Sequence, residues 1–137
     1  MSLFNVFEIS GSSLSAQSVR LNTIASNLAN AEVVGSSEEG AYRGKYPVFS
    51  AAFETAQMNQ GAVGVKVDDI VESKVVPRKE YAPDHPKANE EGYIFRSNVN
   101  SVEEMANMMS ASRSYQSSIA AMNTTKQLIM RTLTLGN

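Results

Sequence analysis

Apolar residues recur at heptad spacing in two stretches near the ends of the chain, and neither stretch contains a glycine or a proline. In residues 12–34 the repeat comprises Leu14, Leu21, Leu28, Ile24 and Ala31. In residues 101–135 it comprises Met105, Ser112, Ile119, Lys126 and Leu133 in one position and Met108, Tyr115, Met122 and Ile129 in the other. A seven-residue period indicates helices that pack along a seam. We therefore predict long N- and C-terminal α-helices packed as a coiled-coil-like pair.

The start of the second helix carries two alternative capping signals. Ser101 is followed three residues later by Glu104, and Asn100 is followed three residues later by Glu103. Both pairs fit a capping box, in which a short polar side chain and an acid satisfy the free N–H groups of the first turn. The sequence favours neither pair over the other.

The centre of the chain has a different pattern, which alternates and is rich in valine and aromatic residues. It predicts short strands near 42–53 and 63–76, with a bulge or turn at Asp68-Asp69. Residues 53–58 fit a helix equally well.

Prolines at 77, 83 and 86 break the pattern that follows, because proline lacks an N–H donor and forces extended geometry on its predecessor. Residues 76–86 are therefore expected to form an extended connector. A polar turn at 89–92 and a short strand at 93–95 are expected to follow.

Charge is concentrated in this centre. Thirteen of the fourteen acidic residues lie between Glu32 and Glu104, and eight of the twelve basic residues lie between Arg43 and Arg96. The sequence thus predicts an α+β chain in three parts. Residues 1–34 and 101–137 form helical assembly segments, and residues 35–100 form a charged middle segment that is β-rich and extended.

The length of the second helix points to neighbouring molecules. About 35 helical residues span roughly 52 Å, whereas a compact chain of 137 residues has a diameter under roughly 40 Å. A helix that extends beyond its own globule and carries an apolar stripe needs partners. Methionines at 105, 108 and 109 suit such an interface, because methionine adapts to irregular surfaces.

Composition leaves few options for chemistry. The chain has no cysteine, one histidine and a net charge of -2, so thiolate chemistry, a histidine metal set and nucleic-acid binding are not expected. No apolar run is long enough to insert into a membrane, and the first residues lack the features of a cleavable signal peptide. We expect no cofactor and no metal.

Two features could still support catalysis, namely His85 beside Asp84 and several adjacent pairs of acidic residues. His85 has no second histidine and no nucleophile-elbow serine to work with, so a turn or packing role is favoured. Adjacent carboxylates do not face each other on a helix or strand, so solvated loops and helix caps explain them better. The sequence therefore predicts a protein that is not an enzyme.

Several stretches together resemble one family. These are the run A-S-N-L-A-N-A at 25–31, the spacing Y-x-P-x-x-P-x-A-x-x-x-G-Y at 81–93, N-V-N at 98–100, S-A-S-R-S-Y-Q at 110–116 and T-L-T-L-G at 132–136. Together they resemble the flagellar axial proteins, the family of rod and hook proteins, and within it the proximal rod proteins. The combination covers most of the chain.

The resemblance implies a structural subunit of the bacterial basal-body rod, located in the periplasmic space. Such a subunit polymerises through its terminal helices to form the drive shaft and export channel. The implied partners are further copies of the chain, the rod proteins FlgB, FlgF, FlgG and FliE, and the flagellar type III export apparatus, which exports the chain without a cleaved signal peptide. A monomeric helical adapter or chaperone of a type III secretion system remains the alternative function, and an enzyme that degrades the cell wall is a weaker rival.

The assembly interface is expected to consist of the apolar heptad positions and two asparagines of the 25–31 run. These are Leu14, Leu21, Ile24, Asn27, Leu28, Asn30, Met105, Met108, Tyr115, Ile119, Met122, Ile129 and Leu133.

Overall fold

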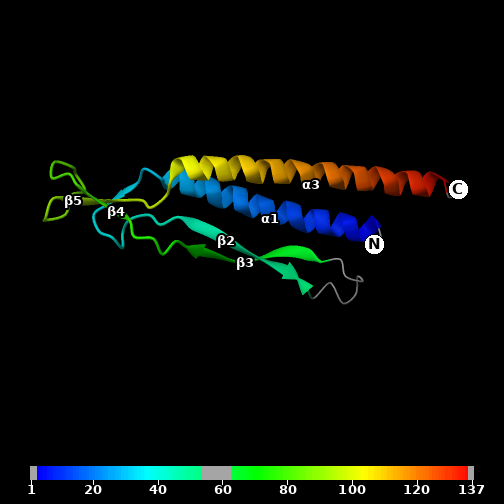
Figure 1. The fold of residues 1–137 in the computed structure, drawn as a ribbon, viewed down its shortest axis with the longest axis horizontal. Helices are drawn as coiled ribbons and strands as arrows, with labels where there is room; N and C mark the ends of the chain where they lie inside the picture. The colour runs from blue at the N-terminus through cyan, green and yellow to red at the C-terminus, as the bar shows by residue number, and fades with distance from the viewer. Residues whose placement is uncertain (1–2, 54–62, 136–137) are drawn as a thin grey trace. The chain divides into compact units, whose positions relative to one another are not determined.

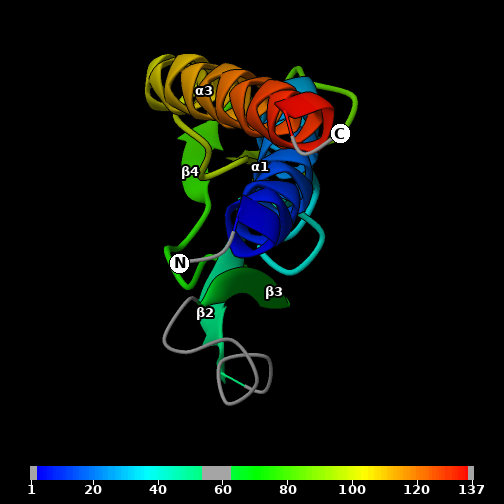
Figure 2. The same cartoon turned by 90° about the vertical axis from the view of Figure 1, so that its right-hand side faces the viewer.

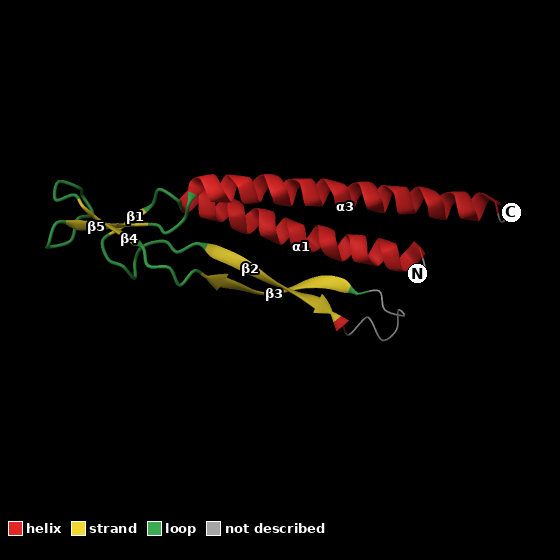
Figure 3. Ribbon diagram, in the orientation of Figure 1, coloured by secondary structure: helices red, strands yellow, loops and turns green. Residues whose placement is uncertain are grey.

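The computed structural model describes residues 3–53 and 63–135 and contains two long helices, α1 (Leu3–Asn30) and α3 (Ser101–Leu135) (Figure 1). The strands that lie between them in the described sequence are β1 (Val34–Gly35), β2 (Lys45–Ala52), β3 (Gly64–Glu72), β4 (Arg78–Tyr81) and β5 (Tyr93–Arg96). Figure 3 shows the helical ends and the strand-containing middle as separate stretches of the sequence. The predicted α+β class is confirmed.

The chain divides into two compact units, each of which draws on both helices. The first unit consists of Met1–Leu21, Pro47–Asp69 and Met109–Asn137, and the second consists of Asn22–Tyr46 and Ile70–Met108. Within each unit a part of α1 lies beside a part of α3 (Figures 1 and 2). The predicted pairing of the terminal helices is therefore confirmed, while the division of the sequence into three functional segments stays a prediction.

Helix α1 differs from the prediction at both ends. It begins at Leu3, nine residues before the predicted start at residue 12, and it runs through Gly11. A glycine inside a helix costs about 1 kcal/mol relative to alanine, but packing in the first unit, where Gly11 faces the Met122 side chain, outweighs this preference. The helix ends at Asn30 and not at residue 34.

Helix α3 is capped by Asn100. The Asn100 Oδ1 accepts the backbone N–H groups of Val102 at 3.1 Å and Glu103 at 3.5 Å, and the Asn100 carbonyl accepts the Glu104 N–H at 2.9 Å. Of the two capping signals in the sequence, the one with asparagine is therefore used. Glu104 is left free for a different role.

The second unit contains a three-stranded antiparallel sheet in the order β1-β5-β4. Strand β5 is central, pairs Arg78 with Arg96 and Tyr81 with Tyr93, and buries Ile94. Strand β4 is an edge strand within the predicted connector, which agrees with the exclusion of a central strand there. The two-residue strand β1 was not predicted, because so short a strand has no periodicity.

The other sheet consists of β2 and β3, so the strands expected near 42–53 and 63–76 are confirmed. Strand β3 continues through Asp68-Asp69, where a bulge or turn was expected. The alternative helix at 53–58 falls, apart from Phe53, outside the described residues. The predicted turn at 89–92 ends at Gly92, whose φ of +81° suits glycine.

Small side chains make up much of the core. Ala16 and Ala111 are buried in the first unit, and Ala31, Ala41, Ile94 and Val99 are buried in the second. Small residues allow helix backbones to approach closely, so there is little space for a larger side chain at these sites.

We predict that Ala111→Leu lowers the free energy of unfolding by about 1–3 kcal/mol, because Ala111 is completely buried and a larger side chain overpacks its site. Urea denaturation of the purified chain, followed by circular dichroism, measures the effect. Ala120→Leu is the matched control, since Ala120 is exposed on the same helix and should change stability by less than about 0.5 kcal/mol. Equal effects of both substitutions would contradict this description of the core.

Candidate assembly interface

The buried face of α3 is spaced by heptads but is not the most apolar face of the helix. Its buried side chains are Glu104, Ala111 and Thr125, with half-buried Ser118 at the intervening heptad position. We call these four residues the seam face of α3. Met108, Tyr115, Met122 and Ile129, which were predicted from the sequence, are half-buried.

The residues of α1 that are buried are also mostly small or polar. They are Ser10, Ala16, Thr23, Ile24 and Asn27. In the first unit, the hydroxyl groups of Ser13 on α1 and Ser118 on α3 lie 3.0 Å apart, at hydrogen-bonding distance. The pairs Ser13 with Ser118 and Gly11 with Met122 run in opposite directions along the two helices, so the helices of this unit are antiparallel.

The structure places the predicted interface residues in three groups. Ile24 and Asn27 are buried within the chain. Leu14, Leu21, Leu28, Asn30, Met108, Tyr115, Met122 and Ile129 are half-buried. Met105, Ile119 and Leu133 are 51%, 38% and 64% exposed. Their role in assembly stays a prediction.

The exposed residues Met105, Ile119 and Leu133 lie at multiples of seven residues along α3, and we call them the outer stripe. The sequence pattern singled out this heptad position, but the position that is buried within the chain begins one residue earlier, at Glu104. Hydrophobicity alone does not reveal this, because the seam face contains a carboxylate, an alanine and two hydroxyl groups. Half-buried Ser112 and exposed Lys126 occupy the heptad positions between the residues of the outer stripe, so the outer stripe consists of three separate apolar side chains on a helix of 35 residues.

Asn27 lies at the centre of a buried hydrogen-bond network in the second unit. Its side-chain amide donates to the Lys45 carbonyl at 2.8 Å and to the Glu104 carboxylate at 3.1 Å. Its side-chain oxygen accepts the Lys45 N–H at 2.8 Å and the Tyr42 hydroxyl at 3.0 Å. All the hydrogen bonds that a carboxamide can make are thus formed within the chain.

Glu104 completes the connection between the helices. It is only 1% exposed, and Asn27 is 0% exposed. Its other oxygen accepts the side-chain amide of Asn107 at 3.4 Å. The sequence pattern indicated a helix-cap role for Glu104 and did not indicate this contact, because Asn27 lies 77 residues away in the chain.

Tyr46 lies close enough to this network that burial and the Glu104 carboxylate both affect its pKa. Burial raises the pKa of its phenol, and Glu104, Glu103 and Tyr42 raise it further. These surroundings favour the neutral phenol over the phenolate. A neutral hydroxyl group is compatible with the nearby carboxylates, whereas a phenolate would be repelled by them.

The N-V-N run also has a structural role in the second unit. Asn98 accepts the Gly44 N–H at 2.8 Å and donates to the Val75 carbonyl at 2.6 Å, while Val99 is buried and Asn100 caps α3. The run thus holds the chain that leads from β5 into α3. Neither Asn98 nor Tyr42 was among the predicted site residues.

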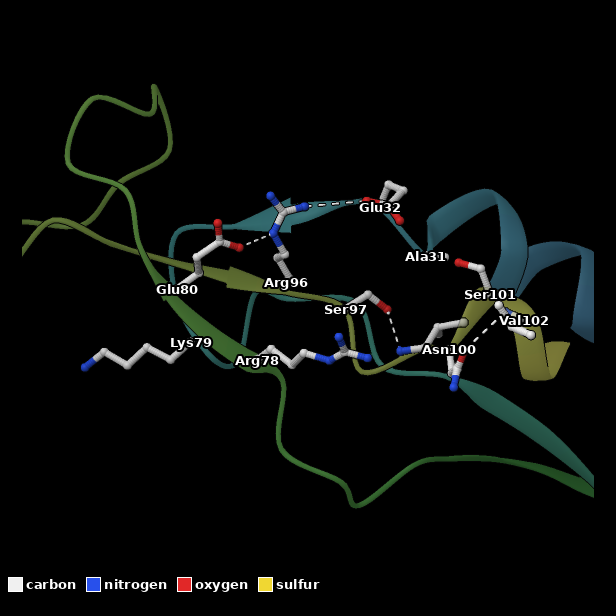
Figure 4. Close-up of a pocket in the computed structure, with 11 residues that line it drawn as sticks. Ala31, Glu32, Arg78, Lys79, Glu80, Arg96, Ser97, Asn100, Ser101 and Val102 are labelled. Carbon is white, nitrogen blue, oxygen red and sulfur yellow. Dashed lines mark hydrogen bonds and ion pairs between the residues drawn. The ribbon is translucent and has the colours of Figure 1, made fainter.

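A pocket of about 530 Å³ lies in the second unit beside β4, β5 and the start of α3 (Figure 4). In it the Arg96 guanidinium donates to Glu80 and lies 3.5 Å from the Glu32 carboxylate. Figure 4 shows Arg96 between these two acids and Arg78 extending from β4. Both carboxylates of this pocket are therefore held as ion-pair partners of one arginine.

The other candidate site residue from the sequence, His85, takes part in a local turn. The His85 Nδ1 accepts the Lys87 N–H at 3.1 Å and so helps to form a turn. Within residues 3–53 and 63–135, no group of three or more acidic or histidine side chains is placed to hold a metal ion. No helix in that same part of the chain combines the length and apolar character needed to cross a membrane.

Two family models match the ends of the chain. The model described as "Flagella basal body rod protein" matches residues 7–35, and the model described as "Flagellar basal body rod FlgEFG protein C-terminal" matches residues 90–135. These ranges include most of α1 and all of α3. They also include Asn27, Asn98, Asn100 and Glu104.

Curated relatives match along the whole length. The chain is 47% identical over 136 residues to the flagellar basal-body rod protein FlgC of Salmonella typhimurium strain LT2, covering 99% of both chains. The FlgC proteins of Escherichia coli O6:H1 and Bacillus subtilis strain 168 are 46% and 34% identical, again with 99% coverage of both chains.

We predict that Asn27→Ala lowers the free energy of unfolding by about 3 kcal/mol, because it leaves the Lys45 backbone groups and Glu104 without a buried partner. Urea denaturation of the full chain is the measurement. Asn30→Ala is the control, since the Asn30 amide donates only to the Ser26 carbonyl of the same helix at an exposed site. The control should stay within about 0.5 kcal/mol, and a similar loss in both variants would refute the central role of Asn27.

Proposed function

Because the chain belongs to the FlgC family of flagellar basal-body rod proteins, we propose that this structural subunit of the rod assembles by burying the outer stripe of α3 against neighbouring subunits. The observation that carries the proposal is the exposure of Met105, Ile119 and Leu133 on one heptad position of a long helix. A rod subunit is surrounded by other subunits, which can cover such a stripe.

Burial of the outer stripe would contribute substantially to assembly. Removing one large apolar side chain from water contributes about 1.5–3 kcal/mol. Residues 105–135 carry only Arg113, Lys126 and Arg131 as charged side chains, so little of this helix is specialised for contact with water. The half-buried Leu14, Leu21 and Leu28 of α1 would extend the same interface.

The partners in this proposal are other copies of the chain and the rod proteins FlgB, FlgF, FlgG and FliE. The proposed place is the periplasmic part of the basal body, where the charged residues 35–100 would lie outside the helical segments 1–34 and 101–137. The proposed role is structural, with no catalytic step. The ion-paired carboxylates at Arg96 and the turn position of His85 fit that role.

We also propose that the chain passes through the flagellar type III export apparatus and that its helical ends become fully stable only on assembly. Small, uncharged residues such as Ser15, Ser18 and Ala25 dominate much of α1, and a helix of this composition is marginal by itself. The buried side chains of the first unit are small or polar, as in Ser10, Ala16 and Ala111, so their burial contributes little stability.

Limited trypsin digestion of the purified chain with mass spectrometry should therefore cut first at Arg113, Lys126 and Arg131, while the second unit, with Ile94 and its buried polar network, is cut more slowly. Equal resistance at all sites would mean that the helices are already stable in the free subunit. The alternative function as a monomeric helical adapter would then be favoured.

Ile119→Asp should abolish incorporation into the rod while the chain is still produced and exported, because a carboxylate at a buried apolar contact leaves an unpaired charge. The measurements are swimming of a strain whose own gene is deleted and detection of the chain in isolated basal bodies. Ser117→Asp is the matched control. Ser117 is exposed about 200° away around α3, so its substitution should leave incorporation and swimming intact. Normal swimming with Ile119→Asp would contradict the proposal.

A further inference from the structure

Helix α3 has two neighbouring faces, and the less apolar one is buried in the chain. The seam face (Glu104, Ala111, Ser118, Thr125) and the outer stripe (Met105, Ile119, Leu133) are offset by one residue, which is about 100° around the helix. Burial of Met105, Ile119 and Leu133 would remove more apolar area from water than burial of the seam face, although Lys126 at the same heptad position would oppose it. Apolar area therefore does not explain which face turns inward, and a specific polar contact of the seam face can.

The contact between Asn27 and Glu104 has the properties needed for this. It joins α1 to α3 at 3.1 Å, and both side chains are almost completely buried. The remaining bonds of Asn27, to Tyr42 and to both backbone groups of Lys45, fix the direction of its amide. The amide therefore cannot turn to follow a rotated helix without losing those bonds.

We propose that Asn27 and Glu104 are positioning residues that set the rotation of α3 and so keep the outer stripe free for neighbouring subunits. The proposal rests on the proposed function, in which neighbours cover that stripe. The pair acts before assembly, within the single subunit. It thereby determines which surface the subunit offers.

Alternative placements of α3 each lose this contact. A rotation by one residue would bring Met105 opposite Asn27, and a shift by one heptad would bring Ala111 there. Neither side chain can replace the carboxylate as a strong hydrogen-bond acceptor. A buried donor without a partner is costly, and so is a buried carboxylate that has lost one, which gives the observed placement its selectivity. The hydroxyl and methyl groups elsewhere on the seam face are similar to one another and discriminate far less.

Thiol labelling of the full chain tests the rotation directly, since the natural sequence contains no cysteine. Met105→Cys reports on the exposed outer stripe and Ala111→Cys on the buried seam face. In each background the rate of modification at Cys introduced at 105 is divided by the rate at 111. With Glu104→Leu this ratio should fall by at least about tenfold, because α3 then turns its outer stripe inward.

Glu104→Gln is the matched control, because it keeps the size of the side chain and an acceptor oxygen for the Asn27 amide. Its labelling ratio should stay within about twofold of the unmodified background. An unchanged ratio in folded Glu104→Leu would overturn the inference, and so would an equal fall in both variants. If circular dichroism shows that Glu104→Leu does not fold, Glu104→Ala is judged by the same criteria, since alanine already occupies position 111 of the seam face.

Swimming of the Glu104→Leu strain separates this inference from the proposed function. A labelling ratio that falls by at least about tenfold, together with lost swimming, supports both the positioning role and the proposed function. The same fall with normal swimming would establish the rotation but contradict the role of the outer stripe in assembly. Lost swimming with an unchanged ratio would overturn the positioning role alone.

Discussion

The second unit depends on one buried carboxamide. Asn27 uses both N–H groups and its oxygen to hold the start of β2, the Tyr42 hydroxyl and the first turn of α3. A buried polar group is costly unless its hydrogen bonds are formed, so these segments stabilise one another through this network. The nearby Asn98 and Asn100 continue the same principle, since each uses its side chain to fix backbone rather than to meet solvent.

Much of the fold could be predicted because its signals are local. The heptads identified both terminal helices, alternation identified β2 and β3, and proline chemistry identified the extended region that contains the edge strand β4. Each of these patterns arises from neighbours within a few residues. The resemblance to axial proteins rested on residues that the structure places at the helix pair, the turn before β5 and the cap of α3.

The rest depends on contacts between distant parts of the chain. The helical conformation around Gly11 is supported by Met122, and no local preference reveals that partner. Glu104 looked like a cap residue, yet its carboxylate is buried against Asn27. The face of α3 that is buried within the chain begins at Glu104, one residue before the heptad position that the apolar pattern marks. A hydrophobic period shows where apolar side chains recur, and in α3 one of its two heptad positions carries the exposed residues Met105, Ile119 and Leu133.

The exposed edge of strand β4 affects how free subunits interact before they are incorporated into the rod. Its outer edge has no neighbouring strand in the described sheet, and Arg78, Lys79 and Glu80 occupy three of its four positions, all exposed. Charged side chains on an open edge oppose the addition of another strand. Copies that meet in solution are thus discouraged from joining edge to edge into aggregates. The charge on this edge therefore acts against pairing of β4 with a strand of another copy.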